Sequence, residues 1–113
     1  MYKKNIFEKR FKESENILKK YPNRIPVIVE KSKKSRSLND IDKNKFLVPD
    51  DMCMNQFIYV IRKRLTLTSE KALFIFINDK LVPNSKRLSE IYNEEKDSDN
   101  FLYVYYSSEN TFG

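Results

Sequence analysis

The chain has 113 residues but only one glycine, its last residue, and it has no histidine. Glycine normally makes up about 7% of a globular chain, so the turns here must be built mainly from Asn, Asp, Ser and Pro. The absence of internal glycine excludes a glycine-rich phosphate-binding loop. The absence of histidine excludes a Ser–His or Cys–His nucleophile pair and a histidine-based zinc site. No paired carboxylates with apolar flanks stand out, so the sequence predicts neither an enzyme nor a protein that holds a metal or another cofactor.

Cysteine and long apolar runs are also scarce. Cys53 is the only cysteine, which excludes an internal disulfide and is typical of a reducing compartment. We expect it to be a small buried or half-buried packing residue. No apolar run approaches the roughly 18 residues that span a bilayer, and the charged residues after Met1 do not resemble a signal peptide. These absences predict a soluble cytoplasmic protein.

The residues that are present predict one folded domain with an uneven charge. Hydrophobic residues make up 40% of the chain, with eight Phe and seven Tyr, which argues against disorder. Residues 1–36 contain twelve Lys or Arg and four Asp or Glu, a balance of +8, so the remainder sums to −2 within a net charge of +6. This asymmetry favours an acidic partner for the N-terminal part, whether a protein, an anionic membrane or a nucleic acid. The simpler alternative is a solvated helix face.

The spacing of apolar residues predicts two helices. Asn5 followed by Glu8 is typical of a capped helix N-terminus, and Pro22 predicts where this helix ends. Apolar side chains recur along one face of the helix, at Phe7, Phe11, Leu18 and Tyr21. A second helix is expected to have Asp50 or Asp51 as its N-cap and to bury apolar residues between positions 54 and 65.

Four short segments are predicted as strands, and they are 25–30, 45–48, 73–77 and 101–106. The segment 81–82 is predicted as a short strand or a turn. The segment 73–77 is apolar throughout, as expected for a central strand that is covered on both faces. Asn78 and Asp79 predict a tight turn, and the apolar residues between 88 and 92 predict a brief helical turn. An acidic, polar segment precedes the last strand.

This order of elements predicts an α+β fold, a ubiquitin-like β-grasp with an additional N-terminal helical segment. The predicted division is an N-terminal helical extension at 1–22, the β-grasp core at 23–106 and a flexible tail at 107–113. The tail ends at Gly113. A terminal residue without Cβ suits chemistry in which the chain end enters a narrow channel of another enzyme, so Gly113 is a candidate for modification.

Several segments resemble the signature of one protein family, the autophagy ubiquitin-like modifiers, which include microtubule-associated-protein light chain 3 and the GABA-receptor-associated protein. These segments occur in the family's order and nearly its spacing, and they are PNRIPVIVEK at 22–31, IDK at 41–43, KFLVP at 45–49, QF at 56–57, VIRKR at 60–64 and FLYV at 101–104. The resemblance runs from about Phe7 to Gly113. The N-terminus is shorter than in typical members, so the family's first short helix is expected to be stunted.

The resemblance implies a lipid-conjugated modifier. In this family the terminal glycine carboxylate, here that of Gly113, is adenylated by an activating enzyme and passed as a thioester to a conjugating enzyme. It is then joined to the amine of phosphatidylethanolamine, which anchors the protein to the autophagosome membrane. Many precursors of the family carry further residues, which a cysteine protease removes. A protein of this kind is expected to be cytoplasmic and monomeric before conjugation.

The resemblance also implies that partner peptides with an aromatic residue, two spacers and an aliphatic residue add as a strand beside residues 45–48. The family pocket for the aromatic residue maps to Glu13, Ile17, Pro26, Ile28, Lys45, Leu47 and Phe101. The pocket for the aliphatic residue maps to Phe46, Val48, Pro49, Met52, Phe57, Val60 and Arg64. Lys43 and Lys45 would meet acidic residues that precede such motifs. A simpler interpretation is that five of these residues, Ile17, Ile28, Leu47, Phe57 and Val60, are core residues.

Three other functions remain as alternatives. A ubiquitin-like module of the same fold would bind partners only noncovalently, and blocking Gly113 would then leave its function unchanged. A nucleic-acid-binding domain would use the basic N-terminal third and bind less tightly as salt rises, but no aromatic-basic motif that would stack bases supports it. Enzyme activity is opposed by the missing histidines and glycine loops.

Overall fold

The computed structural model describes residues 1–33, 35 and 37–109 and contains a five-stranded mixed sheet. In chain order its strands are β1 (Arg24–Lys31), β2 (Lys45–Pro49), β3 (Phe74–Ile77), β4 (Lys80–Leu81) and β5 (Leu102–Ser107). The helical elements are the 3₁₀ turn η1 (Tyr2–Lys4) and the helices α1 (Phe7–Lys20), α2 (Met54–Leu65) and α3 (Leu88–Glu95).

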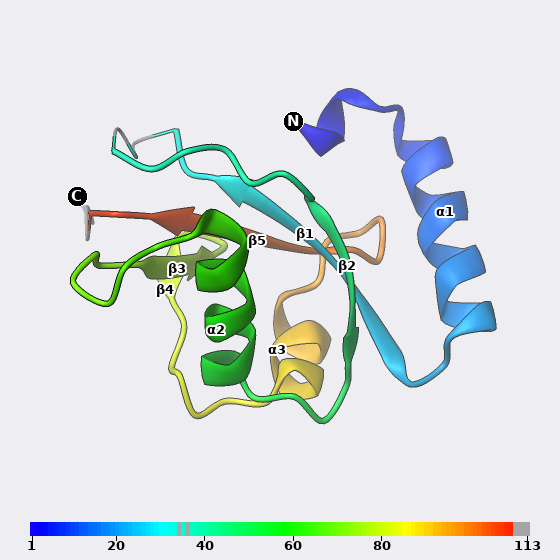
Figure 1. The fold of residues 1–113 in the computed structure, drawn as a ribbon. Coiled ribbons are helices and arrows are strands. Elements are labelled where there is room, and N and C mark those ends of the chain that lie inside the picture. The colour runs from blue at the N-terminus through cyan, green and yellow to red at the C-terminus, as the bar shows by residue number, and fades with distance from the viewer. Residues whose placement is uncertain (34, 36, 110–113) are drawn as a thin grey trace.

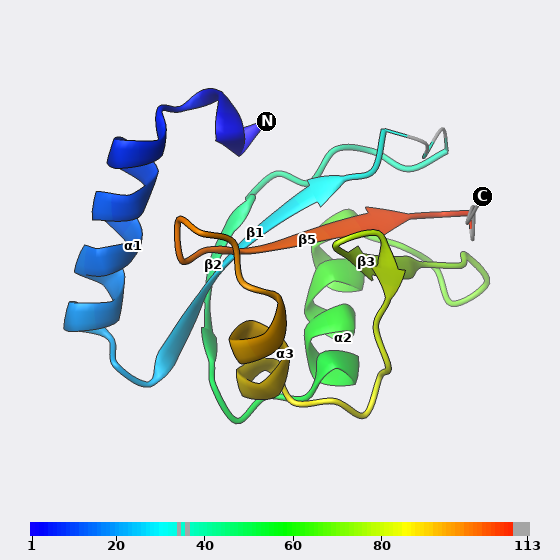
Figure 2. The ribbon, with the colours of Figure 1, turned by 180° about the vertical axis from the view of Figure 1, so that it is seen from behind.

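The strand order across the sheet is β2-β1-β5-β3-β4. Strand β1 pairs antiparallel with β2 and parallel with β5, and β5 pairs antiparallel with β3. Helices α2 and α3 lie side by side against the sheet, whereas α1 lies apart from them at the β1–β2 end (Figure 1, Figure 2). The predicted α+β fold, a β-grasp with an added N-terminal helix, is therefore confirmed.

The main core fills the space between the sheet and helices α2 and α3. Alternate residues of β1, namely Ile25, Val27 and Val29, face this side and are nearly inaccessible to solvent. They pack in one cluster with Phe57 and Ile61 of α2 and with residues of α3 and the other strands. Every second side chain of β1 and the side chains on one face of α2 therefore point into the same core, as the alternation of strand residues and the 3.6-residue period of a helix predict.

A second, smaller cluster lies on the opposite sheet face. Its buried members are Tyr2, Ile28, Phe101 and Tyr103, and Ile17 of α1 packs against them. Both faces of β1 are therefore covered, which explains why this strand reads as a continuous apolar run.

The start of α1 differs from the prediction. The helix begins at Phe7 with Ile6 as its N-cap, so Asn5 is not the cap. The Asn5 side chain instead donates a hydrogen bond to the Tyr2 carbonyl oxygen at 3.2 Å and closes η1. The expected short first helix of the family is thus reduced to a 3₁₀ turn of three residues.

The start of α2 also differs from the prediction. Cys53, which is half-buried as expected, is the N-cap in place of Asp50 or Asp51. The Gln56 side chain accepts a hydrogen bond from the Cys53 backbone N–H at 2.9 Å, which is the returning half of a capping box. The Asp50 N–H bonds instead to the Asn23 carbonyl oxygen at 3.1 Å, so this aspartate belongs to the end of the β1–β2 ladder.

The central strand is β5, so the expectation that β3 is central and covered on both faces was wrong. Ile75 and Ile77 are buried, but Phe74 and Phe76 on the other face are only half-buried. The helix of that face, α1, lies at the far end of the sheet (Figure 1). Continuous apolar sequence therefore overstated how much of β3 is enclosed.

The turn between β3 and β4 is confirmed, because Asn78 and Asp79 both have positive φ, 50° and 62°, as a tight hairpin turn requires. Strand β4 spans Lys80–Leu81 and not 81–82. The brief helical turn expected at 88–92 is the eight-residue helix α3.

The predicted tail begins later than expected. Ser107 is the last residue of β5 and is 1% exposed. The Ser108 hydroxyl accepts a hydrogen bond from Ser37 at 2.7 Å, and the Ser108 N–H donates one to Ser35 Oγ at 3.3 Å. Gly113 and the three residues before it lie outside the described residues.

Candidate functional site

Strand β2 lies at the edge of the sheet, with β1 as its neighbour on one side. The Val29 N–H donates to the Asn44 carbonyl oxygen at 2.7 Å, which sets the alternation of the antiparallel ladder. Even-numbered residues of β2 therefore bond to β1, whereas the backbone groups of Lys45 and Leu47 point outward. Pro26 pairs with Leu47, so its missing N–H removes no ladder bond. The outward row is a template on which an extended chain can pair.

The predicted aromatic-pocket residues lie together on the α1 face of this edge. The ladder places Pro26 opposite Leu47 and Ile28 opposite Lys45, so these four side chains form one cross-strand group. Ile28 is buried and Leu47 is half-buried. The sequence-based set thus contains two adjacent cross-strand pairs on a single sheet face.

The remaining members of this set approach from α1 and from the start of β5. Glu13 and Ile17 are four residues apart on α1, so they project from the same helix face. The Glu13 carboxylate pairs with the Lys45 ammonium. Phe101 is fully buried and, like Ile17, belongs to the smaller cluster. The structure therefore brings all seven predicted residues to one region.

Tyr2 also belongs to this region, although no pattern in the sequence predicts it. Its ring meets the Phe101 ring edge-on, with centroids 5.2 Å apart and an interplanar angle of 66°. Its hydroxyl donates a hydrogen bond to Glu13, and Lys45 Nζ lies 5.2 Å from its ring centroid. A lone aromatic residue ahead of the first helix offers no periodic signal, so only the fold reveals its position.

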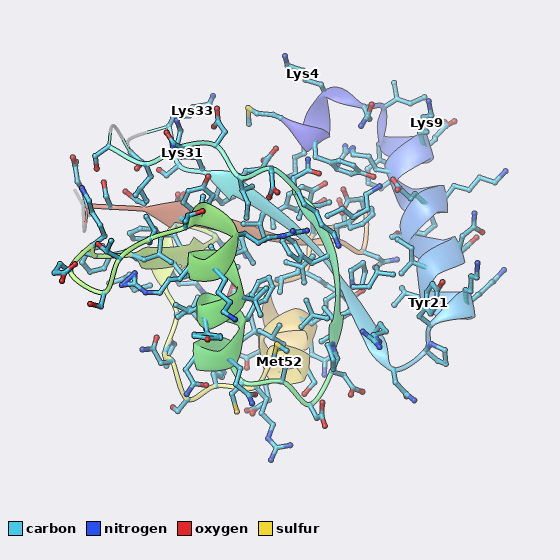
Figure 3. The ribbon with its side chains drawn as sticks, in the orientation of Figure 1. Lys4, Lys9, Tyr21, Lys31, Lys33 and Met52 are labelled. Atoms are coloured by element: carbon cyan, nitrogen blue, oxygen red, sulfur yellow. The ribbon has the colours of Figure 1, made fainter. Side chains whose placement is uncertain are left out.

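Except for Pro49, which strand alternation places on the same face as Lys45 and Leu47, the predicted aliphatic-pocket residues lie on the opposite face, between β2 and α2. Phe46, Val48 and Phe57 are buried in the main core, and the Phe46 and Phe57 rings meet edge-on at 5.7 Å. The members nearer the surface are the half-buried Pro49, Met52 and Val60 and the exposed Arg64. Met52 lies beside the first turn of α2 (Figure 3). Adjacent residues of β2 thus serve opposite faces, as strand geometry requires.

The two predicted acid-binding lysines have different surroundings. Lys43 is exposed, with its Nζ 5.2 Å from the Phe46 ring centroid. Lys45 is half-buried and engaged by Glu13. Lys43 is therefore available for an acidic partner, whereas Lys45 must first leave Glu13.

A buried polar network, which no local sequence pattern predicts, holds α1 against the sheet. Asp99, in the segment read only as acidic and polar, has no exposed surface, and its carboxylate lies 2.5 Å from the Arg10 guanidinium. The same carboxylate accepts a hydrogen bond from the Tyr103 hydroxyl. Ser14, also fully buried, donates to the Asp99 carbonyl oxygen at 2.6 Å. Burial and the Asp99 carboxylate raise the pKa of Tyr103 above its ordinary value.

The predicted apolar face of α1 is not its main contact surface. Phe7 and Tyr21 are 44% and 40% exposed, and the Phe7 ring stacks on the Phe11 ring at 5.9 Å. The one fully buried residue of the helix is Ser14. Helix α1 therefore docks through a polar centre, with partly buried apolar residues around it.

Much of the basic N-terminal part faces solvent. Lys4 and Lys9 project away from the sheet (Figure 3) and are exposed. Lys3 pairs with Asp97 at 2.8 Å, although its side chain remains 43% exposed. Partial burial favours a higher pKa for Asp97, but hydrogen bonds from Lys3 and from the Asp99 N–H outweigh it, and the pKa lies below its ordinary value.

Within the described part of the chain, no group of three or more acidic or cysteine side chains is arranged to hold a metal ion. No helix in the same residues is both long and apolar enough to cross a bilayer.

Comparison with known proteins places this arrangement in a family. The family model described as "Autophagy protein Atg8 ubiquitin like" matches residues 9–113. The chain belongs to the Atg8 family. The resemblance seen in the sequence is thus confirmed, and the chain is an autophagy-related ubiquitin-like protein.

Individual members of the Atg8 family are similar over nearly the whole chain. Autophagy-related protein 8 of Kluyveromyces lactis is 60% identical over 107 residues, which cover 95% of this chain and 86% of the relative. Autophagy-related protein 8e of Arabidopsis thaliana is 56% identical over 109 residues, covering 96% and 88%. The crystal structure of Trypanosoma brucei ATG8 superposes with a TM-score of 0.91 at 42% identity, covering 99% of this chain and 97% of that one.

Proposed function

We propose that this Atg8-family chain is a modifier joined through Gly113 to phosphatidylethanolamine on autophagosomal membranes. In this role it recruits proteins that carry short aromatic-x-x-aliphatic motifs. It works in the cytoplasm before conjugation and on the vesicle membrane afterwards. The chain itself is a substrate and an adaptor, not an enzyme, and its division into helical extension, β-grasp core and conjugated tail serves those two tasks.

The covalent part of the proposal uses chemistry supplied by other enzymes. The Gly113 carboxylate attacks the α-phosphate of ATP and releases pyrophosphate. A cysteine thiolate of the activating enzyme then displaces AMP to form a thioester. After transfer to the conjugating enzyme's cysteine, the lipid amine attacks the thioester carbonyl, expels the thiolate and loses a proton to leave an amide. A cysteine protease reverses this bond by hydrolysis.

One observation supports the peptide-binding part. Lys45 and Leu47 of the predicted aromatic-pocket set and Phe46 and Val48 of the predicted aliphatic-pocket set lie on opposite faces of the same edge strand. A peptide strand paired with the outward backbone of β2 sends alternate side chains to opposite faces. The aromatic residue and the aliphatic residue are three positions apart in the peptide, which is an odd number. Their side chains therefore point to opposite faces, one to the α1 face and the other to the α2 face. Exposed Lys43 lies beside the same edge and suits an acidic flank.

A reconstituted conjugation reaction tests the modifier function. It combines cognate activating and conjugating enzymes, ATP and liposomes containing phosphatidylethanolamine, and compares wild type with Gly113→Ala and with a deletion of Gly113. We expect a lipid adduct with wild type and none with either variant, measured by mass spectrometry. Phe112→Ala is a matched control that leaves the terminal glycine in place.

A noncovalent ubiquitin-like module is the second candidate, because edge pairing at β2 needs no conjugation. It becomes the better account if wild type forms neither thioester nor lipid adduct with enzymes that conjugate a control family member. A lipid adduct on both wild type and the Gly113-deletion variant would also contradict the proposed site.

A further inference from the structure

The N-terminal turn η1 places one side chain among the residues of the predicted aromatic pocket. Tyr2 is only 9% exposed, although it stands one residue from the start of the chain. Its ring is buried in one cluster with Ile28 and Phe101, and it contacts Glu13 and Lys45 as described above. Four of the seven predicted pocket residues therefore surround this ring.

We propose that Tyr2 is an internal occupant of the aromatic pocket and controls access to it. The aromatic side chain of a partner peptide then enters only when Tyr2 leaves. This inference rests on the proposed peptide-binding function and adds a residue that decides how strongly, and for which peptides, the pocket opens.

The contacts of Tyr2 are the ones that an aromatic ligand would make. A pocket of this kind offers a partner an apolar wall, a hydrogen-bond acceptor and a cation above the ring face. Phe101 supplies the wall to Tyr2, the Glu13 carboxylate supplies the acceptor, and Lys45 supplies the cation at 5.2 Å. Aromatic pairs and cation–π contacts of this geometry are favourable, so Tyr2 and an incoming ring compete for the same interactions.

The acidic flank of a peptide provides a second point of competition. In the free chain one Glu13 oxygen accepts from Tyr2 and the other pairs with Lys45. An acidic residue that draws Lys45 away from Glu13 also removes the cation from the face of the Tyr2 ring. A peptide that combines an acidic flank with a ring bearing an N–H or O–H donor therefore replaces the Tyr2 donor to Glu13 and competes with Glu13 for Lys45.

The anchors of η1 lie outside the pocket and are suited to release. The Tyr2 N–H donates to Glu30 at 2.7 Å, and Lys3 pairs with Asp97. Lys3 Nζ also lies 4.5 Å from the Tyr103 ring centroid. Next to these contacts, Met1 and Ile6 are 60% and 66% exposed, so a few bonds hold a short terminal segment that can detach without unfolding the sheet.

Occupancy by Tyr2 weakens the apparent affinity for a peptide in a calculable way. The observed dissociation constant equals the intrinsic one divided by the fraction of molecules in which the pocket is open. If the pocket is open in about 1–10% of molecules, removal of the Tyr2 ring tightens binding by roughly 10- to 100-fold.

The test measures peptide binding by fluorescence anisotropy with the full chain, prepared without added residues at its N-terminus. The probe is a fluorescein-labelled peptide with the core Asp-Asp-Trp-Ala-Ala-Leu, and the same peptide with Ala in place of Trp controls for pocket use. The proteins are wild type, Tyr2→Ala, Tyr2→Phe and Lys4→Ala. Lys4 is the matched control, since it lies in the same turn and is exposed.

We expect Tyr2→Ala to bind the Trp peptide roughly 10- to 100-fold more tightly than wild type does. Tyr2→Phe keeps the ring and loses one hydrogen bond, so we expect a gain of about five-fold. Lys4→Ala should match wild type, and circular dichroism should show that each variant keeps its fold. In NMR spectra, the ring resonances lost in Tyr2→Ala identify Tyr2, and in wild type they should move toward those of an exposed tyrosine when peptide is added.

Two results would overturn the inference in different ways. If wild type binds the Trp peptide and Tyr2→Ala binds it equally or less tightly, Tyr2 is a wall of the pocket and peptide binding itself stands. If neither protein distinguishes the Trp peptide from its Ala control, the peptide-binding function fails, and the inference fails with it.

Discussion

The two faces of the sheet are covered by different kinds of contact. Helices α2 and α3 meet the sheet through a large, almost wholly apolar cluster. On the other face, a small aromatic cluster is bordered by charged groups, including the buried Arg10–Asp99 pair and the Glu13–Lys45 pair. The first face therefore resembles the interior of a domain, and the second resembles an interface between two parts.

This difference separates the tasks of the two faces. Apolar burial is nondirectional and scales with area, so the α2–α3 face supplies most of the stability of the β-grasp core. Buried ion pairs cost desolvation and gain little net stability, and here the Arg10–Asp99 pair joins α1 to the segment before β5. The α1 face accordingly positions Glu13 and Ile17 over the edge strand, where partner binding is proposed.

The largest expected effect is on the apolar face. Phe57→Ala removes a ring that is 1% exposed from the centre of the main core, and we expect it to lower the free energy of unfolding by about 4 kcal/mol. The matched control is Tyr59→Ala on the same helix, because Tyr59 is 59% exposed and its loss should cost about 0.5 kcal/mol or less. Urea denaturation measures both, and similar losses would contradict the assignment of the core.

A somewhat smaller effect is expected on the polar face. Asp99→Asn leaves the Arg10 guanidinium, 11% exposed, without its buried carboxylate. We expect the local free energy that holds α1 against the sheet to fall by about 3 kcal/mol. Because α1 docks through this network, its amide hydrogens should exchange faster while those of α2 keep their protection. Hydrogen exchange followed by NMR measures this difference.

The exposed Lys3–Asp97 pair provides the control for that prediction. Lys3→Ala breaks an ion pair whose lysine is 43% exposed, so it should cost no more than about 1 kcal/mol. Equal destabilisation of α1 and α2 by Asp99→Asn would show that the two faces do not separate energetically.

The smallest expected effect is seen at alkaline pH. Burial raises the pKa of Tyr106, on the apolar face, from 10.0 to about 12, and its hydroxyl donates to the Asn39 carbonyl oxygen at 2.7 Å. Above pH 10 the folded chain therefore retains a proton that the unfolded chain loses. The contribution of Tyr106 to the free energy of unfolding is complete below pH 10. It falls by roughly 1.4 kcal/mol per pH unit as pH rises toward 12.

Tyr106→Phe should flatten that decline, as measured by urea denaturation at several pH values. Tyr103→Phe is the comparison on the polar face, where burial and Asp99 also raise the tyrosine pKa. If neither variant changes the slope above pH 10, other groups govern alkaline stability.

The elements with strong periodic signals were predictable from the sequence. Strands β1, β2 and β5 lie within a residue of their predicted bounds, and helix α2 buries the predicted apolar face, since each has a clear apolar pattern. Helix boundaries were less predictable, because Asn5 and Asp50 have cap-forming side chains but bond elsewhere. A capping preference is weak enough for tertiary contacts to override it.

The polar part of the site was not predictable. Asp99 lies 89 positions from Arg10, and an aspartate among acidic neighbours reads as solvated. Tyr2 likewise gives no sign that its ring returns to the sheet. Long-range polar pairing leaves no local pattern, since it depends on the path of the intervening chain.

The order of elements in the β-grasp, the family resemblance and the candidate Gly113 follow from the sequence, because alternation, apolar spacing and short motifs are local properties of the chain. The face of the edge strand on which each candidate residue lies, the central place of β5 and the burial of Asp99 and Tyr2 follow only from the three-dimensional packing. These features depend on how segments distant in sequence pack together, because that packing determines both which side chains are buried and which charged groups pair.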